Sequence, residues 1–243
     1  MTGVDVAVAR GNLLLNRLTE AELTLLLAEA GEVDLALSAV LYEPGALVEA
    51  VHFPLSGVVS IVTDLGNGDL VEAATVGHEG MSGISVFLGA GAPTERASVQ
   101  VAGHAITLSA DAFERAAAAV DGPLYATMRR YSQTLFTQLA RNAGCNRVHT
   151  VRQRTARWLL TTADRMHSPT FQLTQHFLAQ MLAVRRASVS KQAHDLAADG
   201  CITYLRGTLT ILDRPRLESQ TCACYQVVRD ATERALAPTG HPR

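Results

Sequence analysis

The sequence predicts an α+β protein with an N-terminal β-roll or jelly roll, a long helix and a C-terminal winged helix-turn-helix. Short apolar runs separated by turn residues between Val40 and Leu108 are typical of antiparallel strands, and helical spacing follows them. Near the C-terminus, two helical patterns precede two β-type runs. The 243 residues, 48% of them hydrophobic, are enough for two folded domains. We expect domains at 1–120 and 147–243, joined by a helix at 121–146.

The first element is a short helix. Thr19 and Glu22 have capping-box spacing, so the Thr19 hydroxyl accepts a hydrogen bond from the Glu22 N–H while the carboxylate reaches back to the Thr19 N–H. An amphipathic helix is therefore expected from about Glu20 to Ala30, ending near Gly31.

Strands are expected where apolar runs end at Gly, Pro, Asn or Asp. Five runs have this pattern: Ala46–Phe53, Val58–Thr63, Leu70–Val76, Ala97–Val101 and His104–Leu108. Their spacing favours a sandwich or barrel over βαβ units. Asn67-Gly68 suits a tight hairpin turn in which both residues take positive φ.

Two helices should follow the strands. Ser109 is expected to cap a short helix, and Pro123 suits the first turn of a long one. Along the long helix, side chains recur at 4-3-4-3-4 spacing, as in the a/d seam of a coiled coil. The seam consists of Leu124, Met128, Tyr131, Leu135, Gln138 and Asn142, and Leu139 widens it. This seam predicts pairing with a twin helix in a homodimer; the alternative is a helix packed on its own domain.

The net charge of −2 conceals an uneven distribution. Residues 1–128 contain 4 basic and 16 acidic side chains, whereas residues 129–216 contain 14 basic and 4 acidic ones. Such asymmetry suggests that the basic part meets a polyanion. The alternative is two oppositely charged surfaces that pack on each other.

The C-terminal region contains a helix-turn-helix pattern. Thr174 is a good N-cap for a first helix, whose apolar residues lie on one face. Ala183-Val184-Arg185 forms a short turn, and a second helix is expected over 186–196. Two β-type runs around Arg206-Gly207 then predict a hairpin wing.

The polar side chains of this pattern fit a double-stranded DNA partner. A recognition helix lies in the major groove, where arginine binds guanine O6 and N7 bidentately. Hydroxyl groups and wing residues reach phosphates. The candidate DNA-binding residues are Thr174, Arg185, Arg186, Ser188, Lys191, Gln192 and Arg206. The alternative is a cyclic-nucleotide or other small-ligand sensor whose winged helix contacts protein.

With these features, the chain resembles the Crp/Fnr family of bacterial transcription regulators over nearly its whole length. The motifs that carry the resemblance are Phe53-Pro54-Leu55-Ser56-Gly57, Gly77–Gly83 and Leu173–Asp213. The resemblance implies a β-roll of the cyclic-nucleotide-binding type, a homodimer on a palindromic operator, RNA polymerase as a partner and no enzymatic activity. It also implies that Arg186, Ser188 and Lys191 read bases or phosphates. Ala187 stands where many members carry a base-reading glutamate.

The resemblance also gives the β-roll candidate ligand-binding residues, which are Glu79, Gly83, Arg96 and Ser98. In members that bind cyclic AMP, a glutamate follows a glycine and binds the ribose hydroxyl, while an arginine pairs with the phosphate. Here Ile84 follows Gly83, so that hydroxyl would be buried unpaired at a cost of about 1–3 kcal/mol. The sequence therefore predicts an effector other than cyclic AMP. The alternative is that Arg96 forms a structural ion pair with Glu95 or Glu79.

The four cysteines are interpreted as ordinary reduced thiols, and no metal site is expected. Oxygen-sensing members of the family bind an iron–sulfur cluster mostly through N-terminal cysteines, but the first 144 residues here contain none. Cys222-Ala223-Cys224 could join Cys145 or Cys201 as a redox or metal pair, although zinc sites usually show C-x₂₋₄-C spacing. Single histidines, His149 among them, are expected to be satisfied or exposed. A cupin-like metalloenzyme is a second alternative, with the His78-Glu79 pair as its candidate ligands.

The sequence also bears on the compartment. No run of about 18 apolar residues predicts a membrane span. The N-terminal residues lack the basic and apolar regions of a secretory signal. We therefore expect a cytoplasmic protein without a membrane partner.

Overall fold

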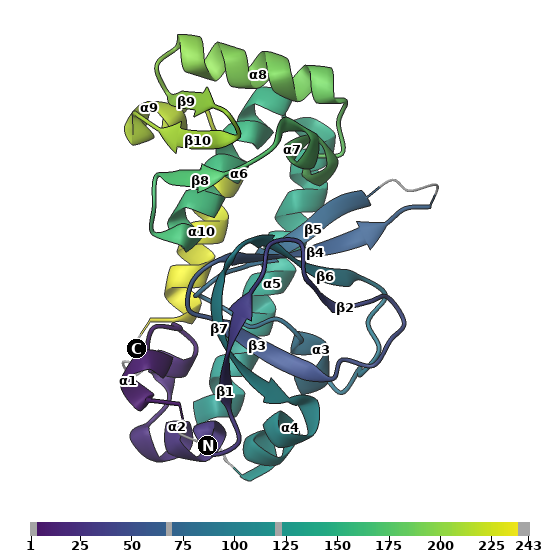
Figure 1. Cartoon of the computed structure of the whole chain (residues 1–243), viewed down its shortest axis with the longest axis vertical. Coiled ribbons are helices and arrows are strands. Elements are labelled where there is room, and N and C mark those ends of the chain that lie inside the picture. The colour runs from purple at the N-terminus through teal and green to yellow at the C-terminus, as the bar shows by residue number, and fades with distance from the viewer. Residues whose placement is uncertain (1–3, 67–69, 120–122, 238–243) are drawn as a thin grey trace.

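The computed structural model describes residues 4–66, 70–119 and 123–237. An N-terminal β-roll forms one end of the molecule and a winged helix the other, and a long helix runs along both (Figure 1). The predicted α+β class, with a β-roll, a long helix and a winged helix, is therefore confirmed.

The β-roll consists of two antiparallel sheets. One has the order β1-β7-β3 and the other β2-β6-β4-β5. Their strands are β1 (Gly31–Leu35), β2 (Val40–Tyr42), β3 (Ala50–Pro54), β4 (Val58–Asp64), β5 (Leu70–Val76), β6 (Arg96–Val101) and β7 (Gly103–Ser109). All five predicted strands are present, and β1 and β2 were not foreseen. The expected hairpin turn at Asn67-Gly68 lies outside the described residues.

Short helices close the roll. They are α1 (Val6–Ala9), a 3₁₀ helix (Leu15–Arg17), α2 (Glu20–Leu27), α3 (Ile84–Phe87) and α4 (Ala110–Ala119). The capping box of Thr19 and Glu22 is present at the start of α2. The predicted end of that helix is wrong, because α2 stops at Leu27 and Gly31 already begins β1. Ser109 caps α4 as expected, accepting from the Ala112 N–H at 3.2 Å.

Glycine is required on steric grounds at position 57, the end of the Phe53–Gly57 motif. Gly57 has φ +82°, and a Cβ atom there would lie 2.7 Å from the Val101 carbonyl oxygen. A side chain would therefore be strained by its backbone and by the neighbouring strand β6. Glycine lets the chain turn from β3 into β4 at this point.

The long helix α5 (Pro123–Val148) packs on its own β-roll. The prediction that Leu124, Met128, Tyr131 and Leu135 form a dimer interface is wrong, because these side chains are at most 7% exposed and belong to the core of the roll. The Tyr131 hydroxyl donates to the Met81 carbonyl at 3.0 Å. For this seam, the alternative prediction is confirmed: the helix packs on its own domain.

The seam ends in amides that also bind the roll. Asn142 donates to the Ala73 carbonyl at 2.8 Å. Gln138 hydrogen-bonds Thr75. Leu139, by contrast, is 42% exposed and lies beside the buried seam rather than in it.

The C-terminal part is a winged helix with two further helices. Its elements are α6 (Val151–Met166), β8 (Thr170–Gln172), α7 (Gln175–Met181), α8 (Arg186–Ala198), β9 (Ile202–Leu205), β10 (Thr208–Ile211), α9 (Arg214–Ser219) and α10 (Cys224–Ala235). The wing has three strands in the order β8-β10-β9, of which β8 was not foreseen. Helix α10 returns alongside α5 (Figure 1). No helix in the described part of the chain is both long and apolar enough to span a membrane.

Polar contacts join the β-roll to helix α6. Trp158 donates from Nε1 to Glu72 on β5 at 3.0 Å. Arg165 pairs through Nε with Glu79 at 2.7 Å, and both side chains are nearly buried. These bonds fix the orientation of α6, and with it the winged helix, against the roll.

Candidate nucleic-acid interface

Helix α8 is oriented by its apolar face. Val189, Ala193 and Leu196 are buried and face the interior of the winged helix. Their 4-3 spacing leaves the opposite face of the helix free. The sequence predicts this split correctly, and the helix extends two residues beyond the expected end.

The turn before α8 is held from both sides. Ala183 takes a left-handed conformation with φ +48°, which reverses the chain after α7. The buried Arg154 of α6 donates to the Leu182 carbonyl at the same turn. Sequence reasoning missed Arg154, because nothing in a linear pattern shows which carbonyl a buried arginine will meet.

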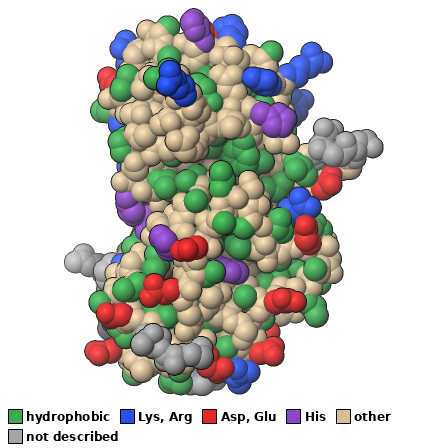
Figure 2. Space-filling model, in the orientation of Figure 1, with side chains coloured by type: hydrophobic (Ala, Val, Ile, Leu, Met, Phe, Trp, Pro, Cys, Tyr) green, Lys and Arg blue, Asp and Glu red, His purple; other side chains and the backbone are tan. Residues whose placement is uncertain are grey.

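The predicted DNA-reading residues lie on the free face of α8 and before it. Arg185, Arg186 and Lys191 are exposed, and Ser188 and Gln192 are half-buried. Figure 2 shows Lys and Arg side chains gathered at the winged-helix end, with most Asp and Glu side chains over the β-roll on this face. The five residues thus form a polar, cationic face at the end of the molecule.

Lys191 is already paired within the helix. Its Nζ lies 2.7 Å from the Asp195 carboxylate one turn later. Both side chains are near the surface, so the pair is weak and exchangeable. A phosphate or a guanine edge can therefore compete with Asp195 for the ammonium group.

The wing presents Arg206 at its tip. Arg206 and Gly207 have φ of +50° and +82°, as a two-residue type I′ hairpin turn requires. This turn joins β9 to β10, and the Arg206 side chain is exposed. The wing therefore displays a cation beside the α8 face.

Thr174 is the N-cap of α7. Its hydroxyl oxygen accepts from the Phe177 N–H at 3.1 Å. The hydroxyl proton is left to donate, and the residue is exposed. The capping role is confirmed, and the phosphate contact stays a prediction.

The positive charge of the basic half is more dispersed than the sequence suggests. Arg154, Arg157 and Arg165 are buried. Arg152 and Arg214 pair with Asp199 and Asp164, respectively. Much of the excess positive charge is therefore neutralised or buried within the protein. The positive charge that a polyanion could contact is that of the exposed cations on α8 and the wing.

The candidate ligand-binding residues of the β-roll do not converge. Glu79 is held by Arg165 of the winged helix. Arg96 does form the alternative ion pair, but its partner is Glu43, 2.7 Å from Nε, and not Glu95 or Glu79. Gly83 precedes α3 with φ +88°, and Ser98 is half-buried in β6. The expected carboxylate–arginine pair around one ligand is not assembled.

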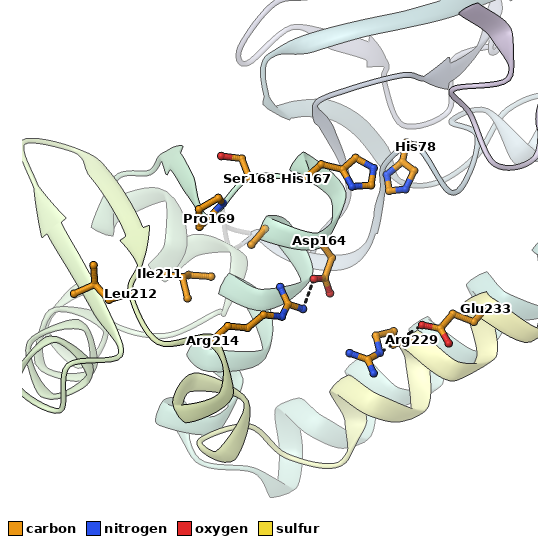
Figure 3. A pocket seen from close by; sticks show the side chains of 11 residues that line it. His78, Asp164, His167, Ser168, Pro169, Ile211, Leu212, Arg214, Arg229 and Glu233 are labelled. Carbon is orange, nitrogen blue, oxygen red and sulfur yellow. Dashed lines mark hydrogen bonds and ion pairs between the residues drawn. The ribbon is translucent and has the colours of Figure 1, made fainter. Parts of the chain in front are cut away.

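A cavity of about 580 Å³ instead lies where the winged helix meets the roll. Figure 3 shows the rings of His78 and His167 close together and Asp164 beside Arg214. The two ring centroids are 4.1 Å apart. Burial lowers the pKa of His78, which favours the neutral ring. No sequence pattern pointed to this junction, because its residues come from four separate segments.

Comparison with known proteins now places this architecture. Residues 153–220 match the Crp-like helix-turn-helix domain. The chain therefore contains a Crp-like helix-turn-helix domain. Its match covers α6 through α9, including the turn and wing described above, and overlaps the motif at Leu173–Asp213 that carried the resemblance.

Solved structures of Crp/Fnr regulators show the same fold over most of this chain. A Crp/Fnr-family regulator from Eubacterium rectale is 15% identical with a TM-score of 0.65, over 85% of this chain and 96% of that one. A CRP-family regulator from Thermus thermophilus is 22% identical with a TM-score of 0.64, over 77% and 95%. The c-di-GMP responsive regulator CLP of Xanthomonas campestris is 15% identical with a TM-score of 0.64, over 80% and 100%. No curated protein matches the sequence.

Proposed function

We propose that this chain is a sequence-specific, DNA-binding transcription regulator that acts as a homodimer. The observation that carries the proposal is the exposed set of Arg185, Arg186 and Lys191 on α8 together with Arg206 at the wing tip. A recognition helix with this face enters the major groove, and a basic wing meets the backbone beside it. Such a protein would act in the cytoplasm, with RNA polymerase as its partner.

The residues divide by the part of DNA they reach. Arg185 and Arg186 stand at the N-terminal end of α8, the end that faces base edges in this class of module. Thr174 and Arg206 flank the helix and are placed for phosphates. Ser188, Lys191 and Gln192 lie further along the exposed side of α8 and suit either bases or backbone.

The homodimer would form on the exposed side of α5. Tyr125 and Phe136 are 56% and 65% exposed, and Leu139 follows on the same stripe. Together with Phe87 at the end of α3 and Leu88 after it, Tyr125 and Phe136 line an open groove of about 550 Å³. Exposed aromatic side chains in one stripe are typical of a helix face that forms a protein–protein interface. A second copy of α5 fits, because its own stripe has the same 4-3 spacing and two-fold pairing is self-complementary.

The DNA-binding proposal is tested by fluorescence anisotropy with labelled DNA from upstream of the gene. The Arg186→Ala/Lys191→Ala double variant should bind at least about 30-fold more weakly, since each base contact is worth about 1–3 kcal/mol. Arg115→Ala, which removes an exposed arginine of the β-roll, is the matched control and should bind normally. Unchanged binding by the double variant would refute the residue assignment. Wild-type binding that is indifferent to salt would favour a protein partner instead.

The dimer is tested by sedimentation. Phe136→Glu places a charge in the proposed seam and should give a monomer at concentrations where the wild type is dimeric. Leu37→Glu changes a similarly exposed leucine between β1 and β2 and should stay dimeric. A dimeric Phe136→Glu protein would move the interface elsewhere.

We also propose that the effector of the β-roll is not cyclic AMP. Ile84 offers no acceptor for the ribose hydroxyl, and Arg96 is occupied by Glu43. Cyclic AMP should therefore leave the melting temperature unchanged. Stabilisation that disappears in Arg96→Ala would contradict this.

A further inference from the structure

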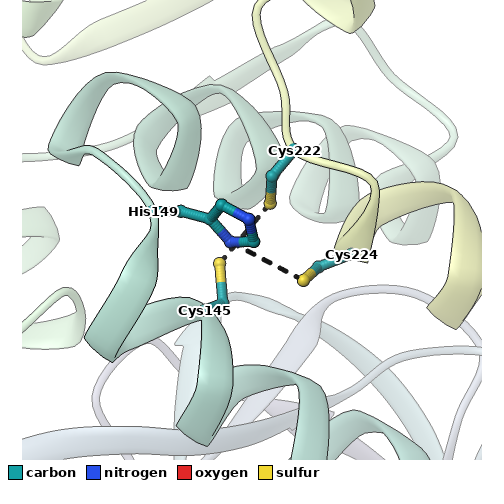
Figure 4. Close-up of side chains that lie close together, drawn as sticks. All are labelled: Cys145, His149, Cys222 and Cys224. Carbon is teal, nitrogen blue, oxygen red and sulfur yellow. Dashed lines mark hydrogen bonds between the residues drawn. The ribbon is translucent and has the colours of Figure 1, made fainter.

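Three cysteines and one histidine lie close together where α5 ends and α10 begins. Figure 4 shows Cys145, His149, Cys222 and Cys224 pointing toward one another. Their ligand atoms all lie within 4.8 Å of one another. The Sγ atoms of Cys145 and Cys222 are 3.5 Å apart, and Cys224 Sγ is 3.8 Å from His149 Nδ1.

Two short motifs build the cluster from distant parts of the chain. Cys145 lies in the last turn of α5, and His149 follows one helical turn later, with its N–H bonded to the Cys145 carbonyl. The i, i+4 spacing places the two side chains on one side of the helix end. Cys222 and Cys224 flank Ala223, the N-cap of α10.

Two of the distances among the four atoms match those of a tetrahedral metal site. With Zn–S bonds of about 2.3 Å and Zn–N bonds of about 2.1 Å, neighbouring ligand atoms lie about 3.5–3.8 Å apart. The two measured contacts already have this spacing. The 3.5 Å sulfur–sulfur distance is far too long for a disulfide, whose bond is about 2.05 Å.

The surroundings also suit a metal. The three cysteines are at most 5% exposed and form a buried cluster of their own, while His149 is half-buried beside an open cavity of about 460 Å³. The cavity gives an ion a route of access. Zinc with three thiolates and one neutral histidine carries a net charge of −1. Arg157, which binds Asn142 at 2.6 Å and interacts electrostatically with Cys145, can balance that charge.

We propose that Cys145, His149, Cys222 and Cys224 bind a zinc ion in a structural site. Just two residues, His149 and Thr150, separate α5 from α6. The ion would tie this hinge to the start of α10, which runs back along α5. The site therefore sets the angle at which the winged helix leaves the long helix, and it does not depend on which partner α8 binds.

Metal content tests the site directly. Full-length protein purified under reducing conditions should hold about one zinc per chain, as a closed four-ligand site does. Cys222→Ser should lose it. Cys201→Ala, which removes a buried cysteine of the winged-helix core, is the matched control and should keep it. A wild type without stoichiometric zinc, or zinc retained by Cys222→Ser, would overturn the proposal.

A second variant guards against misfolding. His149→Cys changes a half-buried residue and replaces one zinc ligand by another, so it should retain the ion. With cobalt in place of zinc, this variant should show stronger sulfur-to-metal charge-transfer absorption than the wild type. An unchanged cobalt spectrum would remove His149 from the site. A Cys145–Cys222 disulfide with no bound metal, seen by mass spectrometry, would replace the zinc site by a redox pair.

The linking role has its own readout. Removal of zinc by a chelator should speed hydrogen exchange of the first amides of α10, because the ion holds the start of this helix. Exchange in β1, which belongs to the other sheet of the roll, should not change. Equal exchange in α10 with and without zinc would contradict the proposed link to the hinge.

Discussion

Replacing Glu72 by glutamine should stabilise the protein at alkaline pH and leave it unchanged at acidic pH. Glu72 lies on β5 and is 8% exposed. Burial raises the pKa of its carboxyl from 4.5 to about 7, against the opposing effects of Ser60, Arg157, Arg165 and Trp158. The carboxyl is therefore neutral in the folded protein over a range in which it is ionised in the unfolded chain.

The hydrogen bonds at Glu72 fit a neutral carboxyl. Ser60 Oγ lies 2.8 Å from Glu72 Oε2 and 2.7 Å from Gln100 Oε1, so one hydroxyl proton faces two acceptors. A protonated Glu72 donates to Ser60, and Ser60 then donates to Gln100. Gln100 continues to Thr162 of α6, which carries the chain of bonds across the domain junction.

The magnitude follows from the two pKa values. Between 4.5 and about 7 the folded protein holds a proton that the unfolded chain has released, so stability falls as the pH rises through this window. Each tenfold difference in proton affinity is worth about 1.4 kcal/mol, which gives a loss of about 3 kcal/mol above pH 7. Glu72→Gln removes the ionisation, and its carbonyl oxygen can still accept from Trp158.

The assay is urea unfolding of wild type and variant at pH 4.5 and pH 8. The variant should be more stable by up to about 3 kcal/mol at pH 8, or about 6–12 °C in melting temperature, and about equal at pH 4.5. Comparing the two proteins cancels the opposite contribution of the half-buried His52 and His78, whose pKa values burial lowers. Glu32→Gln, on the exposed side of β1, is the control and should change little.

Fluorescence provides an independent check. Trp158 is the single tryptophan of the chain and donates directly to Glu72. Its emission should change with pH around a midpoint of about 7, and this change should be absent in Glu72→Gln. A variant that is no more stable than wild type at pH 8 would show that Glu72 is ionised and held by Arg157 and Arg165, and the reasoning would fail.

Three further substitutions have definite expected results. Arg206→Asn keeps a residue that tolerates the positive φ of the wing turn, so folding should persist while DNA affinity falls and the salt slope of binding decreases by about 1; an unchanged slope would place the wing away from the backbone. Asp195→Asn releases Lys191 and removes a negative charge from α8, so DNA titrations should show tighter binding. Weaker binding would mean that the ion pair between Lys191 and Asp195 orients Lys191 for DNA. Gly80→Ala places a Cβ 2.3 Å from the Tyr131 hydroxyl, so urea unfolding should show that the free energy of unfolding falls by about 2 kcal/mol or more. An unfolding free energy equal to that of the wild type would mean that the loop before α3 is easily displaced.

Features decided by neighbouring residues could be predicted from the sequence. The capping box at Thr19, the N-cap at Thr174 and the hairpin turn at Arg206-Gly207 depend on a few adjacent residues, and all are present. The outward face of α8 followed from helical spacing. Strand β1 escaped prediction, because its Gly-Glu-Val-Asp-Leu sequence has few apolar residues and one strongly buried side chain.

Features decided by distant residues could not be predicted. The spacing along α5 shows an apolar face but not what covers it, and the β-roll covers the seam that was assigned to a partner. The cysteine cluster joins residues 77 positions apart, and its histidine looks like an isolated one in the sequence. Cys222-Ala223-Cys224 and the Cys-x-x-x-His spacing at Cys145 were the local signals, and they become one site only when α10 folds back along α5.

Selection of bound fragments from a random pool of double-stranded DNA shows whether α8 and the wing read DNA as part of a two-fold dimer. A two-fold dimer should enrich a palindrome whose half-sites are centred about one helical turn apart, roughly 10 base pairs. The Arg186→Ala protein should lose the preference at one position in each half-site. If the wild-type protein enriched no sequence, α8 and the wing would not read DNA in this way. The same conclusion would follow if the Arg186→Ala and Lys191→Ala variants both enriched the same palindrome as the wild type.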